Sequence, residues 1–143
     1  MKSYFFYTDQ LTVGYDGKPL IREINIRLNK GEILRLIGPN GAGKSTILKS
    51  ITRQLSLISG TVYLEQAEMS RMTNKEVSKK LAVVLTERMR PELMTCEDVV
   101  ATGRYPYTGT LGILSEEDKQ KVRNAMEMVH AGDLKDRDFT AIS

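Results

Sequence analysis

The sequence is poor in the side chains that bind transition metals or form cross-links. Its 143 residues include one cysteine, Cys96, and one histidine, His130. A single cysteine excludes an internal disulfide, and one cysteine with one histidine gives too few ligands for a transition-metal site. We therefore expect Cys96 to be a small buried residue. His130 lies near the end of a helical stretch, where we expect a solvated or capping role.

The sequence also lacks long apolar runs and a large excess of charge. No segment approaches the roughly 18 apolar residues of a membrane-spanning helix, and the N-terminus shows no signal-peptide pattern. The formal net charge is +3, which neither indicates a nucleic-acid partner nor excludes a membrane-associated one. With 41% hydrophobic and 27% charged residues, the composition is typical of a cytosolic globular protein with one core.

The strongest motif is the glycine-rich segment 38–46, which reads G-P-N-G-A-G-K-S-T. It matches the phosphate-binding pattern G-x-x-x-x-G-K-[ST], the P-loop. The apolar run 33–37 predicts a buried strand before the loop, and apolar residues spaced through 47–55 predict an amphipathic helix after it. Such a unit forms an anion cradle, because backbone N–H groups point inward and the helix dipole adds partial positive charge.

The side chains of the P-loop suggest distinct roles. Lys44 can reach the β- and γ-phosphates of a nucleotide and is the main catalytic candidate, and the Ser45 hydroxyl can ligate Mg²⁺. The alternative is a chance match in an ordinary glycine-rich turn, against which the flanking strand and helix patterns argue. The expected nucleotide contacts in the loop are Gly38, Pro39, Asn40, Gly41, Ala42, Gly43, Lys44, Ser45 and Thr46.

Strand signals lie on both sides of the P-loop. Asp16-Gly17 is a hairpin turn signal, and the alternation of apolar and polar residues over 24–28 predicts a half-buried strand. The runs 61–64 and 81–85 predict two more strands, the second of them buried. Between these runs, a capping box at residues 73–76 predicts the start of a short helix.

The part of the chain after residue 86 is predicted to be mainly helical. One helix should begin at Thr95 or Cys96 and end near Gly103. A longer helix should open at residues 115–118, whose acidic side chains favour the positive end of a helix. Periodicity places Val122, Ala125, Met126 and Val129 on its core face, with Gly132 as its C-terminal cap.

Over nearly the whole chain, these residues resemble the ATP-binding subunits of ABC transporters. Asn40 and the Ser45-Thr46 pair match the family's form of the P-loop. Tyr15, in Val13-Gly14-Tyr15, resembles the family's adenine-stacking position, where a flat ring stacks on the base; the alternative is a half-buried strand tyrosine. Segment 133–143 resembles the stretch leading into the family signature L-S-G-G-Q, with Ile142-Ser143 in its first two places.

The resemblance implies an α/β fold, a P-loop NTPase core with an N-terminal antiparallel β-subdomain and the start of a helical subdomain. Residues 1–86 would form the strands and the core, and residues 87–143 a partial helical subdomain. ATP and Mg²⁺ are the implied cofactors. The rest of the signature, the acidic strand end, the catalytic glutamate and the switch histidine lie further along in the family. We therefore expect a truncated ABC ATPase domain that does not hydrolyse ATP by itself.

The family's glutamine loop, which senses Mg²⁺ and the attacking water, should follow residues 81–85. The sequence there is Thr86-Glu87-Arg88, without a glutamine. Thr86 could replace the amide oxygen as a Mg²⁺ contact, and Glu87 could contact the metal or the water, which makes it a second catalytic candidate. A solvated hinge is an equal alternative.

The run 99–109 resembles the family branch that imports iron–siderophore chelates, haem or cobalamin. In that branch a Gly-Arg-Tyr/x-Pro element lies in the subdomain that faces the membrane partner. Arg104, Tyr105 and Tyr107 are the candidate docking residues, because Arg and Tyr are favoured interface anchors. The alternative is a proline-stiffened surface loop between two helices.

The resemblance thus implies the ATPase subunit of an ABC importer at the cytoplasmic face of the membrane, with iron chelates as the expected cargo. Its implied partners are integral membrane permease subunits, a second ATPase subunit in a homodimer and, indirectly, a substrate-binding protein; nucleic acid is not expected. The alternatives are a soluble ABC-type ATPase not coupled to transport and a nucleotide-binding module without hydrolysis. The antiparallel strands before the P-loop, together with Tyr15, argue against a P-loop kinase.

Overall fold

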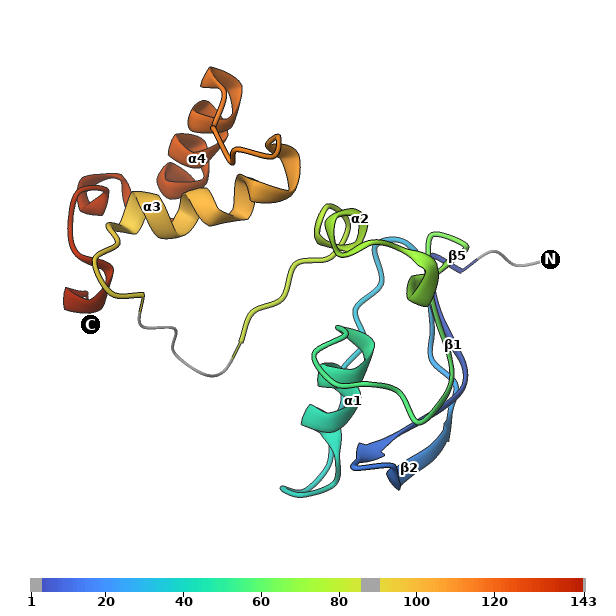
Figure 1. Cartoon of the computed structure of the whole chain (residues 1–143). Coiled ribbons are helices and arrows are strands. Elements are labelled where there is room, and N and C mark those ends of the chain that lie inside the picture. Colours follow the sequence, from blue (N-terminus) through green and yellow to red (C-terminus); the bar gives the residue numbers. More distant parts are fainter. Residues whose placement is uncertain (1–3, 86–90, 143) are drawn as a thin grey trace. The chain divides into compact units, whose positions relative to one another are not determined.

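The computed structural model of the chain describes residues 4–85 and 91–142 (Figure 1). The chain divides into two compact units, Met1–Val83 and Val84–Ser143, and each is described by itself. In the described parts of both units, every helix is too short or too polar to cross a membrane.

The first unit is built on an antiparallel sheet. Its strand order is β2-β1-β4-β5, and β3 also pairs with β1. The predicted turn at Asp16-Gly17 is confirmed: both residues have left-handed φ values, 49° and 72°, and join paired residues Tyr15 and Lys18. Such a two-residue turn matches the twist of a hairpin. The strands are β1 (Phe6–Tyr15), β2 (Lys18–Ile24), β3 (Arg27–Leu28), β4 (Ser59–Leu64) and β5 (Ala67–Glu68).

The predicted strand over 24–28 is half-buried as expected but is split into two. Ile24, Ile26 and Leu28 are partly buried, and the residues between them are exposed. The split arises at Thr8, whose hydroxyl donates to the Ile24 carbonyl at 2.8 Å and accepts from the Ile26 N–H at 2.9 Å. The Thr8 N–H also donates to the Ile26 carbonyl at 3.0 Å, so side-chain and backbone bonds of Thr8 together hold the interruption between β2 and β3.

The core of the first unit lies where the sheet meets the helices that follow it. Leu11, Val13, Val62 and Leu64 of the strands are buried together with Met69 and Val77. The unit's helices are α1 (Lys44–Ile51), η1 (Met69–Arg71) and α2 (Asn74–Ser78). Ile47 and Ile51 of α1 pack against this core, so the predicted amphipathic helix after the P-loop is present.

The predicted capping box of α2 is confirmed. The Thr73 hydroxyl accepts from the Glu76 N–H at 3.2 Å, and the Glu76 carboxylate accepts from the Thr73 N–H at 2.7 Å. These bonds satisfy two backbone donors that a helix start leaves open. The bond from the Thr73 N–H, together with a second bond from the Thr73 hydroxyl to the same carboxylate at 2.8 Å, lowers the pKa of Glu76.

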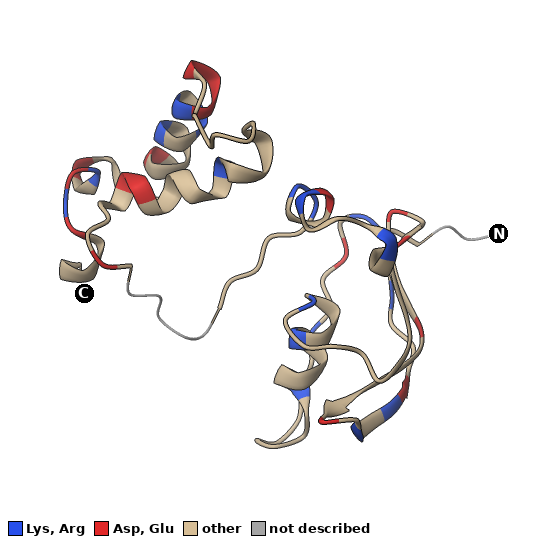
Figure 2. Ribbon diagram, in the orientation of Figure 1, with Lys and Arg blue, Asp and Glu red and all other residues tan. Residues whose placement is uncertain are grey.

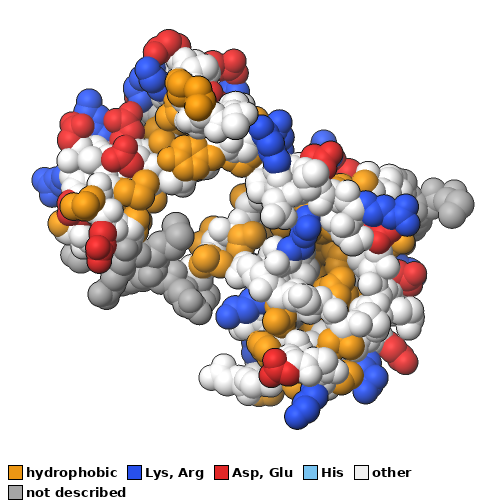
Figure 3. Space-filling model, in the orientation of Figure 1, with side chains coloured by type: hydrophobic (Ala, Val, Ile, Leu, Met, Phe, Trp, Pro, Cys, Tyr) orange, Lys and Arg blue, Asp and Glu red, His pale blue; other side chains and the backbone are white. Residues whose placement is uncertain are grey.

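The two predicted buried strands at 33–37 and 81–85 are not formed. Neither segment has strand structure, and the exposed fraction reaches 90% at Ile37 and 98% at Val84. The apolar pattern gives strand propensity, but a strand forms only when a neighbour completes its hydrogen bonds. Among the described residues, no strand pairs with either segment, so apolar side chains remain at the surface. Figure 3 shows apolar side chains at the surface.

The second unit is helical, as predicted. Both expected helix starts are confirmed, because Thr95 and Ser115 each cap a helix with their hydroxyl, reciprocated by Asp98 and Asp118. Cys96 is buried, as expected, and its N–H donates to the Arg137 carbonyl at 2.9 Å. The elements are α3 (Cys96–Ala101), η2 (Thr102–Tyr107), α4 (Glu116–Met128), η3 (Gly132–Leu134) and η4 (Phe139–Ala141).

The core face of α4 is narrower than predicted. Val122 and Met126 are buried, whereas Ala125 and Val129 are exposed. The helix ends earlier because His130, not Gly132, adopts the left-handed conformation that closes it, with φ 56°. The His130 N–H donates to the Glu127 carbonyl at 3.0 Å and the Ala131 N–H to the Met126 carbonyl at 2.9 Å. This is a Schellman cap, so His130 has the capping role that was one of its two expected roles.

Candidate functional site

The P-loop forms a tight turn between residue 37 and the start of α1. Gly43 is the N-cap of the helix and has a left-handed φ of 84°. A Cβ on Gly43 would lie 2.5 Å from Cδ1 of Ile21 and 3.2 Å from Cδ2 of Leu20, both in β2. Glycine is therefore required here for its conformation and for the close approach of the hairpin.

The start of α1 has the properties of an anion site. Gly43 supplies no side-chain cap, and the first turn contains no acidic residue. The first N–H groups of a helix have no partner within the helix, and the helix dipole favours a negative group in front of them. Lys44 begins this turn, so the only charged side chain of the loop is positive.

Lys44 folds back over the loop. Its Nζ donates to the carbonyls of Gly38 and Pro39, at 2.7 Å each. The Ala42 N–H donates to the Pro39 carbonyl at 3.2 Å and closes the turn. The ammonium group thus lies at the loop itself, where it can neutralise phosphate oxygens.

The two hydroxyl groups after Lys44 lie in different surroundings. Ser45 is exposed, whereas Thr46 is buried on the side of α1 that faces the sheet. An exposed hydroxyl beside a phosphate cradle fits Mg²⁺, which accepts one protein oxygen together with phosphate oxygens and waters. Within residues 4–85 and 91–142, no group of three or more His, Cys, Asp or Glu is placed to hold a metal ion. The exposed Ser45 hydroxyl is thus the group at this site that fits Mg²⁺ as a companion of bound phosphate.

Tyr15 lies beside the P-loop helix. It is the last residue of β1, and its hydroxyl is 3.1 Å from Oγ1 of Thr46. The residue is 48% exposed, so part of its ring is accessible. The structure thus brings Tyr15 to the phosphate site, 31 residues away in the sequence, while stacking on adenine stays a prediction.

Leu20 and Ile21 belong to this site and were missed. Both side chains contact the position where a Gly43 Cβ would stand. The signal for them is their place in the strand directly after the Asp16-Gly17 turn, because a hairpin that carries Tyr15 to the P-loop also carries its second strand there.

Three predicted residues lie outside the described residues. These are Thr86 and Glu87, the candidate replacements for the glutamine, and Ser143, at the start of the signature.

The candidate docking segment in the second unit is organised around Arg104. Its Nε and Nη2 lie 2.9 and 2.7 Å from Oδ1 of Asp118, and its guanidinium carbon is 3.9 Å from the centre of the Tyr107 ring. The side chains of Arg104 and Asp118 are only 18% and 10% exposed. Arg104 thus holds the segment together, and Tyr105, which is 53% exposed, is more accessible to a partner.

Asp118 is the most strongly shifted acidic group in this cluster. It accepts from the Ser115 hydroxyl at 2.7 Å while it binds Arg104. The Ser115 hydrogen bond and the Arg104 hydrogen bond lower the pKa of Asp118 to about 2. The carboxylate therefore serves both as a helix cap and as the partner of Arg104. Figure 2 shows acidic residues at the start of α4.

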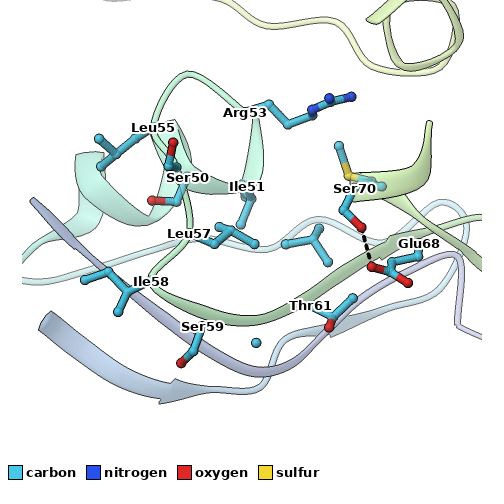
Figure 4. Close-up of a pocket in the computed structure, with 14 residues that line it drawn as sticks. Ser50, Ile51, Arg53, Leu55, Leu57, Ile58, Ser59, Thr61, Glu68 and Ser70 are labelled. Carbon is cyan, nitrogen blue, oxygen red and sulfur yellow. Dashed lines mark hydrogen bonds between the residues drawn. The ribbon is translucent and has the colours of Figure 1, made fainter. Parts of the chain in front are cut away.

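A separate cavity of about 560 Å³ lies near the C-terminal end of α1 and contains no P-loop residue (Figure 4). Arg53, Glu68 and Ser70 are among its lining residues, with a hydrogen bond from the Ser70 hydroxyl to the Glu68 carboxylate. Ser50, on α1, also lines it, and its buried hydroxyl has no hydrogen-bond partner among the described residues. The cavity is thus distinct from the phosphate site.

The glycine turn, the bare helix start and Lys44 together define a P-loop protein. The chain belongs to the ABC transporter family, whose sequence profile matches residues 21–143. The predicted family and P-loop NTPase fold class are therefore confirmed.

The chain is similar to several members of that family. It is 45% identical over 136 residues to an uncharacterized ABC transporter ATP-binding protein of Methanocaldococcus jannaschii, covering 95% of this chain and 47% of the relative. It is 35% identical to the iron(3+)-hydroxamate import ATP-binding protein of Bacillus subtilis, covering 95% of this chain and 51% of the relative. The chain thus spans about half the length of the curated relatives it matches.

A solved structure agrees with the fold. The crystal structure of a nucleotide-free ATP-binding cassette from an ABC transporter matches with a TM-score of 0.78 and 26% identity. The match covers 98% of this chain and 59% of that one.

Proposed function

We propose that the protein is the ATP-binding subunit that powers an ABC importer through ATP binding and hydrolysis. The observation that carries the proposal is the P-loop at the start of α1, with Lys44 bound over its carbonyls and no acidic side chain in the first turn. This arrangement favours the triphosphate of a nucleotide over a neutral ligand.

Each part of the site has a role in this proposal. The backbone of residues 38–43 and the first N–H groups of α1 bind the phosphates, and Lys44 neutralises the β- and γ-phosphate oxygens. The Tyr15 ring stacks on the adenine. Ser45 supplies one ligand to Mg²⁺, which when bound neutralises charge between the terminal phosphates. Thr86 and Glu87 remain candidates for contacts to the metal and the attacking water.

The proposed partners follow from the second unit. We propose that Tyr105 and Tyr107 contact an integral membrane permease subunit, which places the protein at the cytoplasmic face of the membrane. Exposed tyrosine rings are frequent anchors in protein interfaces. A second ATPase subunit, in a homodimer, and indirectly a substrate-binding protein complete the proposed assembly.

The proposed cargo is an iron–siderophore or related iron chelate. The support is the similarity to an import protein for iron(3+)-hydroxamate and the Gly103-Arg104-Tyr105-Pro106 element. A soluble ABC-type ATPase without a permease is the alternative. A nucleotide-binding module without hydrolysis is the alternative for the 143-residue chain by itself.

The first test compares Lys44→Ala with Lys49→Ala, a basic residue in the last turn of the same helix. Titration of the purified chain with a fluorescent ATP analogue should show ATP affinity lower by about tenfold or more for Lys44→Ala, because a charge-assisted contact is lost. Lys49→Ala should change it by less than about twofold, as expected for a surface charge. Equal effects of both variants, or no ATP binding by the unmodified chain, would contradict the proposal.

Transport is tested with the intact protein and its permease in proteoliposomes. Uptake of a radiolabelled ferric hydroxamate should require ATP inside the vesicle and should disappear with Lys44→Ala. ATP hydrolysis that no permease affects would favour the soluble alternative.

A further inference from the structure

We propose that Thr46 is a positioning residue for the base end of the nucleotide, because its hydroxyl holds the Tyr15 ring in place before the nucleotide binds. The inference rests on the proposed function, since it assumes that ATP is the ligand. The inference goes further by coupling two parts of the site that were predicted from separate motifs, the phosphate cradle and the aromatic ring.

The hydrogen bond joins the half-exposed Tyr15 side chain to the buried Thr46 side chain. Thr46 is buried in the first turn of α1, with an exposed fraction of 4%. The Tyr15 hydroxyl lies 3.1 Å from its Oγ1, and either oxygen can act as donor. A half-exposed tyrosine ring can rotate when its hydroxyl has no protein partner. The bond to Thr46 restricts that rotation.

The backbone of Tyr15 is held as well. Tyr15 pairs with Lys18 across the hairpin turn, and Ile21 of the same hairpin lies where a Gly43 Cβ would stand. The hairpin is therefore packed against the loop, and α1 contacts β1 (Figure 1). A tyrosine fixed at its backbone and at its hydroxyl has little side-chain freedom left to lose.

Fixing the ring in advance should increase affinity for a ligand that stacks on it. Ordering a free side chain on binding opposes association, and a preorganised side chain avoids that loss. Removal of either hydroxyl should therefore weaken ATP binding even though the aromatic ring is kept. The affinity for a ligand that has phosphates but no base should not depend on this bond.

The test uses Tyr15→Phe, Thr46→Val and the double variant, with Thr52→Val as the matched control. Thr52 is the C-cap residue of α1, and its hydroxyl donates to the Leu48 carbonyl at 2.8 Å. Affinities of the purified chain for ATP and for inorganic tripolyphosphate are measured by isothermal titration calorimetry. Thermal unfolding of each variant shows whether it is folded. If Thr46→Val fails to fold, Tyr15→Phe still tests the bond, because it removes only the hydroxyl group of a half-exposed residue.

We expect Tyr15→Phe and Thr46→Val each to weaken ATP binding by roughly threefold to tenfold. The double variant should be no weaker than the single ones, because both remove the same bond. Tyr15→Phe should leave the affinity for tripolyphosphate unchanged, and Thr46→Val should weaken ATP binding more than tripolyphosphate binding. Thr52→Val should match the unmodified chain for both ligands.

Two results would overturn the inference while leaving ATP binding intact. One is unchanged ATP affinity in Tyr15→Phe. The other is a Thr46→Val variant that loses affinity for tripolyphosphate as much as for ATP, which would make Thr46 a phosphate contact only. Failure of the unmodified chain to bind ATP would instead contradict the proposed function.

Discussion

Arg104 and Asp118 form an ion pair that joins η2 to the first turn of α4, with Nη2 2.7 Å from Oδ1. The same carboxylate caps α4 by accepting from the Ser115 N–H at 3.1 Å. One side chain therefore stabilises a helix start and the segment that carries Tyr105. A change at Asp118 should affect both.

We expect Asp118→Ala to destabilise the second unit more than Glu117→Ala does. Asp118→Ala leaves the partly buried Arg104 without its carboxylate partner, whereas Glu117 makes only an exposed pair with Lys121, four residues along the helix. Urea unfolding followed by circular dichroism would measure the difference. Equal midpoints for the two variants would show that the Arg104 pair contributes nothing beyond a surface pair.

The lowered pKa of Asp118 predicts a pH-dependent contribution to stability. Its folded pKa is about 2, below the ordinary 3.8, so the folded state binds fewer protons than the unfolded state between these values. The stabilisation is therefore complete above about pH 5 and is lost progressively as the pH falls from there towards 2.

Asp118→Asn isolates this contribution, because other carboxylates titrate in both proteins. The difference in urea midpoint between the unmodified chain and Asp118→Asn should be constant from pH 7 to about pH 5 and should shrink between pH 4 and pH 2. A difference that stayed constant down to pH 2 would contradict the assignment.

Docking on a permease should depend on Tyr105 itself. We expect Tyr105→Ala in the intact protein to lower reconstituted uptake roughly tenfold, as for an interface anchor, while ATPase activity in detergent is kept. Leu111→Ala is the matched control, because Leu111 is also exposed and lies near Tyr105 in the chain. Normal uptake with Tyr105→Ala would favour the surface-loop alternative.

Much of the fold could be predicted from local sequence signals. The hairpin at Asp16-Gly17, the capping box at Thr73 and the helix start at Ser115 depend on residues within a few positions of one another, and all are present. The predictions of strands at 33–37 and 81–85 were wrong. Apolar character indicates that a segment can be buried, but a strand also needs a neighbouring strand to complete its hydrogen bonds.

Contacts across long sequence distances were harder to predict. Neither the Tyr15–Thr46 hydrogen bond nor the packing of Ile21 on Gly43 has a local signal, since each joins a hairpin to a helix beyond the loop. The ion pair of Arg104 was missed for the same reason. The charge of Arg104 and its Gly-Arg-Tyr context suggested docking, whereas its partner, Asp118, is 14 residues away.

Ser50 gives a test of stability in the first unit. Its buried hydroxyl has no hydrogen-bond partner among the described residues, and alanine has the higher helix propensity. We expect Ser50→Ala to raise the free energy of unfolding by about 1 kcal/mol. Ser78→Ala is the control, because the Ser78 hydroxyl donates to the Asn74 carbonyl at 2.8 Å and its loss should not stabilise. A destabilised Ser50→Ala variant would indicate that water or another group binds this hydroxyl.

The exposed apolar segments 33–37 and 81–85 should make the 143-residue chain self-associate. Segments with strand propensity and unpaired backbone groups pair readily with another chain, and contiguous apolar surface adds to the attraction. Light scattering should show an apparent mass above the monomer at concentrations on the order of 10 μM. Ile37→Lys combined with Val84→Lys should lower it, because charges on an unpaired strand oppose pairing. Leu111→Lys, a control at an exposed loop position, should leave the apparent mass unchanged. A monodisperse monomer at all concentrations would show that these segments do not cause self-association.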